Sequence, residues 1–322
     1  MLQRLNKKLE KIMPLIAPSS VVIGVLLAGD LSQLSVYVPW IFAFMTFTGS
    51  LSSNVKSLKH AVMQPIPIFI ALFTLHIFMP IWAWTIGHIT FSGDMLTITG
   101  LVLAMVIPTG ITSFIWVSIC RGNVALTLSI ILIDTILSPI IVPYTLSIFI
   151  GQTVEMEIWN IMKGLFGMVV IPSIIGMSLN QYTKGTVKET LGTRLAPFSK
   201  IALASVIMIN SAVVAPYLSN LSWSLIYTAL VVFIIAFSGY LVSWVIGRLL
   251  KREKEEVIAL TFTGGMRNIS AGAVIAVAYF PARVAVPVVI GMLFQQVLAS
   301  IYGHLLERFY KKNKVEHNYG GS

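Results

Sequence analysis

Apolar segments long enough to cross a bilayer follow one another along nearly the whole chain. A membrane-spanning helix needs about 17–25 mostly apolar residues, because it rises about 1.5 Å per residue across roughly 30 Å of hydrocarbon. Ten segments meet this length, with only short polar turns between them. They cover residues 13–29, 37–53, 66–90, 95–120, 123–150, 157–180, 198–217, 222–249, 257–280 and 283–307. The pattern predicts an all-α polytopic membrane protein with ten transmembrane helices.

Composition supports the membrane class and limits the covalent chemistry. The 322 residues are 57% hydrophobic and only 11% charged, and the mean hydropathy is +0.88. Because soluble domains carry about 25% charged residues, this composition excludes an ordinary soluble domain. The single cysteine, Cys120, excludes an intrachain disulfide and a cysteine-based metal site.

Basic residues mark one side of the membrane. With the N-terminus inside, all but three of the 22 Lys and Arg residues fall on that same side. The exceptions are Lys163, Arg267 and Arg283, and the acids of the opposite loops are Asp30, Asp94, Glu155 and Glu157. This distribution follows the positive-inside rule. It predicts a multi-pass protein of the cell (inner or plasma) membrane with both termini cytoplasmic, and it makes the net charge of +10 a topology signal rather than a nucleic-acid footprint.

Two interrupted segments occupy matching places in the two halves of the chain. Each half holds five predicted helices, an odd number, so two similar halves must have opposite orientations in the membrane. Residues 122–127 resemble residues 282–287, and each run follows a segment that helix-weakening residues interrupt, at 108–113 and at 263–268. Matched interruptions are the best sequence indication of a transporter site. They predict two inverted five-helix repeats in which helices 4 and 9 are broken.

Arg267 lies near the middle of the ninth segment, just after Gly264 and Gly265. An arginine at a helix centre costs about 2.5–3.5 kcal/mol on insertion scales, and each glycine costs roughly 0.5–1 kcal/mol relative to alanine. An anchoring helix needs neither. We therefore interpret residues 261–268 as a discontinuous helix whose freed backbone groups line a solute site. The alternative interpretation is a packing glycine pair beside a snorkelling arginine.

Asp134 in the fifth segment and His76 in the third also lie mid-membrane. Buried charges are almost always paired, so Asp134 is the expected partner of Arg267. The pair is either a structural salt bridge or a built-in replacement for a bound cation. Histidine changes its charge near physiological pH, so His76 is either a protonation site or a satisfied core residue. Gln295 and Gln296 of the tenth segment add amide groups that bind solute or link helices.

At the two interruptions the sequence resembles the bile acid:sodium symporter family. The matching residues are Pro-Thr-Gly-Ile-Thr-Ser at 108–113, Arg-Gly-Asn-Val-Ala-Leu at 121–126, Ser-Pro at 138–139 and Gly-Met-Arg-Asn at 265–268. The resemblance implies a bacterial homologue of the apical sodium-dependent bile acid transporter, with broken helices 4 and 9 crossing. It implies a panel domain of residues 13–64 (helices 1 and 2) and 157–217 (helices 6 and 7). A core domain would comprise residues 65–150 (helices 3–5) and 222–310 (helices 8–10).

The ligands of the family's first sodium site are only partly present. The resemblance places oxygen ligands of that site at Ser113 and Thr127, and both residues keep a hydroxyl. A family asparagine and a further hydroxyl are replaced by Phe114 and Ile131.

The ligands of the second site depart further from the family pattern. The family's acidic residue on helix 9, which serves both sites, aligns with Thr263, and a glutamine aligns with Arg267. The helix 3 glutamine appears as Leu75, beside His76. At about 4 Å, two unit charges interact by about 4 kcal/mol at an effective dielectric of 20, so Arg267 would oppose sodium nearby. The resemblance therefore implies degraded sodium sites. We expect the Arg267 guanidinium to stand where the family's second sodium stands, within reach of Asn268 and of the carbonyls freed at the first interruption.

These features predict a secondary active transporter of an organic anion, with alternating access and weak or no sodium coupling. The solute class is a bile-acid-like steroid or a small carboxylate such as pantoate. The expected substrate-binding residues are Ile111, Thr112, Ser113, Arg267, Asn268, Gln295 and Gln296. The expected ion or charge site comprises Ser113, Thr127, Thr263, Arg267, Asp134 and His76. No cofactor or metal is expected, and bound sodium is not expected at the altered sites. The expected partners are the lipid bilayer and the small anion, and the protein is expected to be a monomer.

Other functions remain open or are excluded by motif. A sodium- or proton-coupled symporter of the same solutes is one alternative, and a membrane channel or sensor is another. The sequence contains no His-Glu-x-x-His run, no Gly-x-Ser-x-Gly and no nucleotide-binding Gly-x4-Gly-Lys-Ser/Thr loop. An enzyme is therefore not expected.

Overall fold

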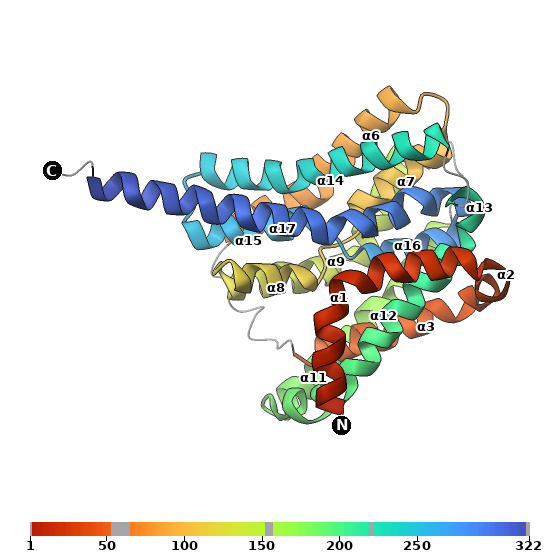
Figure 1. Cartoon of the computed structure of the whole chain (residues 1–322), viewed down its shortest axis with the longest axis horizontal. Helices are drawn as coiled ribbons and strands as arrows, with labels where there is room; N and C mark the ends of the chain where they lie inside the picture. The colour runs from red at the N-terminus through yellow and green to blue at the C-terminus, as the bar shows by residue number, and fades with distance from the viewer. Residues whose placement is uncertain (1, 53–64, 152–156, 219–221, 320–322) are drawn as a thin grey trace.

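The computed structural model describes residues 2–52, 65–151, 157–218 and 222–319, and within these ranges the chain is helical with no strand. Glu155 of the predicted topology lies outside them. In chain order the elements shown in Figure 1 are α1 (Leu2–Leu26), α2 (Ala28–Leu31), η1 (Ser32–Tyr37), α3 (Val38–Ser50), α5 (Pro65–Phe73), η2 (Thr74–Phe78), α6 (Met79–Thr90), α7 (Met95–Val106), α8 (Thr112–Ile119), α9 (Val124–Ile150), α10 (Ile158–Leu165), η3 (Phe166–Val170), α11 (Ile171–Tyr182), η4 (Lys188–Gly192), α12 (Thr193–Val213), α13 (Ala215–Leu218), α14 (Trp223–Leu249), α15 (Lys254–Gly265), α16 (Ile269–Tyr279) and α17 (Ala282–Tyr319).

Within the described ranges, seven helical runs are long and apolar enough to cross a membrane. They are Ala28–Ser50, Pro65–Thr90, Val124–Ile150, Ile158–Tyr182, Lys188–Val213, Trp223–Leu249 and Ala282–Lys311. Each overlaps one of the predicted segments. The other three predicted segments correspond to α1 and to two interrupted pairs, α7 with α8 and α15 with α16. The prediction of an all-helical, multi-pass protein is confirmed, whereas the count of ten spans and the inverted repeat stay predictions.

The first interruption follows from Pro108. A proline disfavours the helical conformation of the residue before it, and Ile107 is accordingly extended, with φ −59° and ψ 140°. Helix α7 therefore ends at Val106. Thr112 and Ser113, which we expected inside the break, already belong to α8.

The second interruption falls at Met266–Asn268. Gly264 and Gly265 still belong to α15, and Met266 is the first extended residue, with φ −96° and ψ 141°. The two glycines let α14 approach closely, because a Cβ on Gly264 would lie 2.0 Å from the Ser243 Oγ and one on Gly265 would lie 2.3 Å from the Tyr240 ring. The glycine pair thus serves packing, as the alternative interpretation held, while the helix is also discontinuous.

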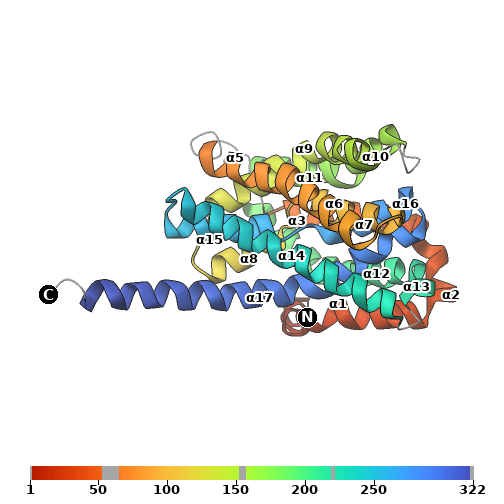
Figure 2. The same ribbon diagram turned by 90° about the horizontal axis from the view of Figure 1, so that it is seen from above.

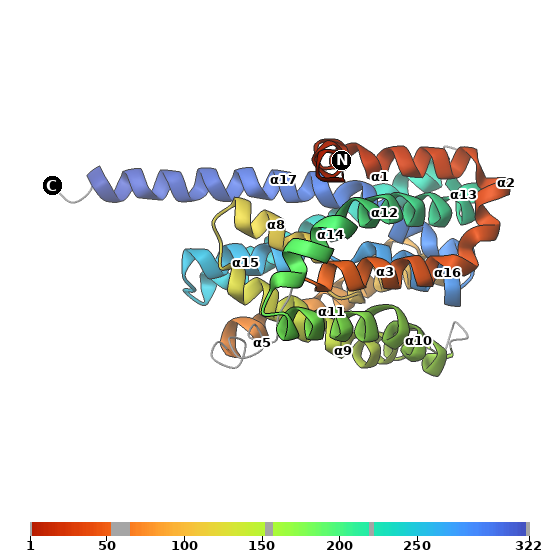
Figure 3. The same ribbon diagram turned by 90° about the horizontal axis from the view of Figure 1, so that it is seen from below.

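The helices pack in two groups. In the first, α1 lies along α12, and α3 lies between α11 and α12, as Figure 3 shows from below. In the second, α14 packs on α15 and α17, and α7 packs on α6 and α17, as Figure 2 shows from above. The division into panel and core domains stays a prediction.

Helix α16 is one of the places where the two groups meet. It packs against α12 and α3 of the first group and against α10. The approach to α10 is so close that a Cβ on Gly164 would lie 2.0 Å from the Tyr279 hydroxyl oxygen. These contacts lie toward the end of the molecule that carries Asp94 and Arg283, whose carboxylate and guanidinium form an ion pair at 2.5 Å.

Candidate functional site

The two interruptions are in direct contact. The Asn268 N–H donates to the Pro108 carbonyl oxygen at 2.8 Å, and the Thr109 hydroxyl donates to the Met266 carbonyl oxygen at 3.1 Å. Gly110 permits this approach, because a Cβ there would lie 2.9 Å from the Arg267 carbonyl oxygen. Each break therefore supplies hydrogen-bond partners to the other, and we call this contact the crossing (residues 107–111 with 266–268).

The carbonyl groups of Met105 and Gly264, at the ends of α7 and α15, lose their normal donors at the crossing. In an unbroken helix, the N–H of residue i donates to the carbonyl oxygen of residue i−4. The Met105 carbonyl would then accept the Thr109 N–H, and the Gly264 carbonyl would accept the Asn268 N–H. Here the Thr109 N–H donates to Asp134 at 2.6 Å instead, and the Asn268 N–H donates to Pro108. Carbonyls left without donors in a membrane interior cost several kcal/mol.

Arg267 supplies the missing donors. Its Nε donates to the Met105 carbonyl oxygen at 3.0 Å, and its Nη1 donates to the Gly264 carbonyl at 2.7 Å and to the Met266 carbonyl at 3.3 Å. The residue is only 2% exposed. Its Nη2 has no hydrogen-bond partner in the described part of the chain. The guanidinium thus joins the C-terminal ends of α7 and α15, where the helix dipoles favour a cation.

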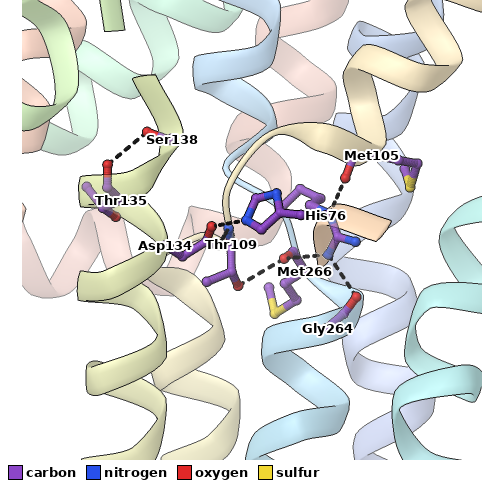
Figure 4. A network of polar contacts seen from close by, with 9 residues as sticks. His76, Met105, Thr109, Asp134, Thr135, Ser138, Gly264 and Met266 are labelled. Carbon is purple, nitrogen blue, oxygen red and sulfur yellow. Dashed lines mark hydrogen bonds and ion pairs between the residues drawn. The ribbon is translucent and has the colours of Figure 1, made fainter. Parts of the chain in front are cut away.

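Asp134 does not form the predicted direct pair with Arg267. Its Oδ1 lies 2.5 Å from the His76 Nε2, and its Oδ2 accepts the Thr109 N–H, as Figure 4 shows. Both carboxylate oxygens are therefore engaged. The direct pairing of Arg267 with Asp134 was wrong because the guanidinium fork is occupied by backbone carbonyls, although Asp134 is still close enough to act on it electrostatically.

His76 lies in η2, a π turn in the middle of the helical run from α5 to α6. Such turns are rare and occur frequently at functional sites. The residue is 8% exposed. A carboxylate is only an acceptor, so Nε2 carries the proton in the pair with Asp134. The other ring nitrogen, Nδ1, is buried and unpartnered among the residues that the structure describes.

The two predicted glutamines lie beside the crossing. The Gln295 side-chain oxygen accepts the Arg267 backbone N–H at 3.0 Å, and the Gln296 side-chain oxygen accepts the Trp116 indole N–H at 3.0 Å. Tyr240 donates its hydroxyl to the Gln295 carbonyl oxygen at 3.2 Å. Both glutamines are partly exposed. They link α17 to the crossing and to α8, and their amide NH2 groups leave donors at the edge of the site.

The N-termini of α8 and α16 both begin at the crossing, and they differ. Asn268 caps α16, because its side-chain oxygen accepts the Ala271 N–H at 3.4 Å. No side chain caps α8 at Ile111. Ile111 is 44% exposed and Thr112 is partly exposed. The first turn of α8 already uses two of its backbone N–H groups, because Ser113 donates to the Gly110 carbonyl oxygen at 3.0 Å and Phe114 to the Ile111 carbonyl oxygen at 3.2 Å. The start of α8 therefore presents mainly the positive end of a helix dipole at a partly exposed position.

The hydroxyl groups predicted for ion binding are all fully buried. Thr127 donates to the Asn123 carbonyl oxygen at 2.9 Å, and Thr263 donates to the Ala259 carbonyl oxygen at 2.8 Å. The Ser113 Oγ is unpartnered within the described ranges. Sodium prefers several oxygen ligands including charge-neutralising ones, and these three hydroxyls come without a carboxylate of their own. Across the described residues, no cluster of three or more His, Cys, Asp or Glu is placed to hold a metal ion.

The sequence interpretation missed the role of Thr109 and the Gly264 carbonyl, whereas it expected Arg267 to lie within reach of freed carbonyls at the first interruption, which the Met105 contact bears out. Thr109 is the connecting residue, because its N–H reaches Asp134 and its hydroxyl reaches Met266. Its place between a proline and a glycine was a usable signal. Pro108 indicated that carbonyl groups near the first interruption would be free, but only the geometry shows which carbonyls Arg267 meets.

The faces of the site differ in access. Toward the end with Asp94, α16 is packed under α10 and α12. Toward the end with Arg121, Arg248 and Lys254, α8 packs on α9 and α15. Its opposite face is exposed along its length at Ile111, Ile115 (53%) and Ile119 (64%). We call the end with the three cations the basic end.

Comparisons with known proteins agree with the geometry. The model of the Sodium Bile acid symporter family matches residues 39–221, more than half of the chain. The uncharacterized protein YbaS of Bacillus subtilis (strain 168) is 57% identical over 304 residues, which cover 94% of this chain and 99% of that protein. The uncharacterized sodium-dependent transporter YocS of the same strain is 23% identical over 289 residues, covering 90% of this chain and 87% of YocS. The probable sodium/metabolite cotransporter BASS1, chloroplastic, of Oryza sativa subsp. japonica is 26% identical over 257 residues, covering 80% of this chain and 61% of that protein. With its broken helices in contact around a buried charge, this chain belongs to the sodium bile acid symporter family, a family of membrane transporters rather than enzymes.

Proposed function

We propose that the protein is a secondary transporter of a small organic anion, a bile-acid-like steroid or a small carboxylate such as pantoate, that works by alternating access without sodium as its coupling ion. Relatives are named as sodium-dependent transporters or sodium/metabolite cotransporters. The proposal keeps their transport of a solute and departs from their use of sodium.

The position of Arg267 supports this most directly. In transporters with discontinuous helices, unwound carbonyls and half-helix C-termini coordinate the coupling cation. In this chain one guanidinium, that of Arg267, donates hydrogen bonds to the carbonyl oxygens of Met105, Gly264 and Met266. A sodium ion would have to displace that side chain and then bear its repulsion. The guanidinium therefore does structurally what a bound cation does: it neutralises the carbonyl ends and holds the crossing together.

Electrostatics at the start of α8 favours an anion. The positive end of α8 lies at the exposed Ile111 and the partly exposed Thr112, and the dipole of a helix favours an anion at its N-terminus. Arg267 is buried, so it contributes through its field rather than by touching the solute. The amide groups of Gln295 and Gln296 stand at the edge of the same region. We assign these groups to solute binding.

The uneven packing supports alternating access. Toward the Asp94 end α16 packs against α10 and α12, whereas one face of α8 is exposed. With the basic end taken as cytoplasmic by the positive-inside rule, we propose that this arrangement is the inward-facing one. Rocking one group of helices against the other would open the Asp94 end and close the basic end.

The test is anion uptake into proteoliposomes that contain the purified full-length chain, with taurocholate and pantoate as probes. Uptake in sodium is compared with uptake in choline and in potassium. We expect the three rates to agree within about twofold, since Arg267 occupies the place of a metal cation at the crossing. A more than tenfold dependence on sodium would show that the coupling assignment is wrong. Counterflow separates a carrier from a channel, because only a carrier exchanges labelled anion against a trapped unlabelled pool.

Topology has its own test. Cysteines placed singly in the segment 184–194, between α11 and α12, should react with a membrane-impermeant maleimide from the cytoplasmic side only. The matched control is a cysteine at Gly93, which lies in the turn next to Asp94 and carries a positive φ of 87°. It should react from the opposite side. Labelling of 184–194 from outside would overturn the proposed orientation.

A further inference from the structure

We infer that His76 and Asp134 form a proton-binding site, and that the proton taken up at this site accompanies the anion. The inference rests on the proposed function for the identity of the cargo, and on the crossing for its geometry. It names the ion that replaces sodium.

The first step is the free acceptor. With Nε2–H donated to the Asp134 Oδ1 at 2.5 Å, the His76 Nδ1 is a buried nitrogen with a lone pair and no donor in the described part of the chain. A solvent proton that binds there converts the neutral ring to imidazolium. The reaction forms one N–H bond and breaks none in the protein. Asp134 already faces the ring, so the new positive charge has a carboxylate in contact.

The second step is the charge balance of the buried centre. Arg267 carries one positive charge and Asp134 one negative charge, so the centre is neutral while His76 is neutral. A monoanion bound at the start of α8 then has no net positive partner. One proton on His76 gives the centre a single positive charge and makes the loaded core neutral. Since carrying a net charge through a low-dielectric interior is costly, the proton and anion favour each other.

The surroundings contain few groups that compete for this role. Besides its own run, η2 packs against α7, α9 and α14. Helix α7 carries no titratable side chain. Helix α9 contributes the buried Asp134, and α14 contributes the buried Tyr240. The other titratable groups of these two helices, Tyr144, Tyr227 and Arg248, are exposed. Arg267 itself comes from the α15–α16 break. The second histidine of the run, His88 on α6, lies near the far end and pairs its Nδ1 with the Trp84 carbonyl oxygen at 2.9 Å.

The third step links the proton to movement of the crossing. The Asp134 Oδ2 accepts the Thr109 N–H, and the Thr109 hydroxyl donates to the Met266 carbonyl that Arg267 also contacts. A change of charge on His76 alters how strongly Asp134 holds Thr109. Thr109 lies three residues before the start of α8, where the anion binds. The hydrogen bonds therefore connect His76 to the crossing, and the backbone continues from Thr109 to the start of α8, where we place the anion.

A direct test is histidine titration in the full-length protein. The chain has five histidines, and in nanodiscs with 15N-labelled histidine the His76 signals are identified by their loss in His76→Gln. We expect them to change from the neutral Nε2–H form to imidazolium between about pH 5 and 9, the range that brackets the ordinary histidine transition. Saturating taurocholate or pantoate should move the midpoint upward, because binding linkage is reciprocal. A His76 signal that stays constant from pH 5 to 9 overturns the inference, whatever the transport result.

A transport test follows the same pair in sodium-free proteoliposomes. An inward acid gradient of about 1.5 pH units can drive at most about 30-fold accumulation of an anion carried with one proton, since each unit is a factor of ten. We expect the ratio of accumulation with and without the gradient to approach this value in the parent and in the control His88→Gln, and to fall to about 1 in His76→Gln. An equal ratio in all three proteins overturns the inference while leaving the proposed function intact. If the parent shows no counterflow with either probe, the proposed function is wrong. The titration of His76 then tests the proton-binding site independently of transport.

Discussion

Replacing Arg267 with methionine removes the cation from the crossing while keeping an unbranched side chain of comparable reach. The Met105 and Gly264 carbonyl oxygens then lose the donors that replaced Thr109 and Asn268. The Met266 carbonyl keeps the Thr109 hydroxyl. Two buried carbonyls are therefore uncovered, and Asp134 loses the nearby positive charge.

The magnitude follows from these losses. Each buried acceptor left without a donor costs about 1–3 kcal/mol, and removing one member of a buried charged group typically costs about 3–5 kcal/mol. The two figures describe overlapping effects, so we expect Arg267→Met to lower the free energy of unfolding by about 3–5 kcal/mol. At about 2 °C per kcal/mol, the value for large chains, the melting temperature falls by roughly 6–10 °C. Arg267→Lys keeps the positive charge but not the planar guanidinium, so its melting temperature should lie between those of Arg267→Met and the parent.

Thermal unfolding of the detergent-solubilised full-length protein measures this directly. The matched control is Arg283→Met, because Arg283 also lies away from the basic end. It pairs with Asp94, and its side chain is 46% exposed. Exposed pairs contribute about 0–1 kcal/mol, so this control should melt within about 2 °C of the parent. If Arg267→Met melts with the control, the guanidinium does not hold the crossing, and the argument from the displaced carbonyl donors fails.

Two further predictions concern the ion and the closed end. The double variant Arg267→Gln with Thr263→Glu restores the side chains that the family resemblance places at these positions. If it binds sodium with a Kd of about 10 mM, its free energy of unfolding should be about 1.4 kcal/mol higher, roughly 3 °C in melting temperature, in 100 mM sodium than in choline. The stability of the parent should be the same in both salts. Gly164→Val places a side chain against the Tyr279 hydroxyl and should hold the Asp94 end open, so labelling of a cysteine on the exposed face of α8 from the basic side should fall severalfold. Gly167→Val is its control, because a Cβ at Gly167 meets nothing within 4 Å. Unchanged labelling in Gly164→Val would mean that this contact is not part of the closure.

The fold was largely readable from hydropathy, and the reason is physical. A bilayer forces each spanning segment to satisfy its own backbone, so length and apolarity alone mark the runs Pro65–Thr90, Val124–Ile150 and Trp223–Leu249. The two interruptions were readable for the same reason, since Pro108 removes a donor that a membrane helix needs. Their limits shifted by a few residues because helical turns form wherever packing permits, as at Gly264 and Gly265.

The pairing inside the site was not readable. His76 and Asp134 lie at similar depth in their segments, but which neighbour a carboxylate meets depends on helix rotation, and the π turn at Thr74–Phe78 rotates the rest of its run. Arg267 was expected to choose the carboxylate because charge is visible in a sequence. It takes backbone carbonyls instead, and these become available only when Thr109 and Asn268 donate across the crossing.

The tethered guanidinium also has a consequence for energy supply. A side chain is present at a constant effective concentration, so its occupancy of the crossing does not vary with the salt on either side and other monovalent cations cannot compete for it by dilution or excess. An ion does work for a carrier only when it enters on one side and leaves on the other. Arg267 never leaves, so the structural task of the cation is separated from the task of driving uphill flux. Any accumulation by this protein has to draw on the anion's own gradient, the membrane potential or a second, releasable charge.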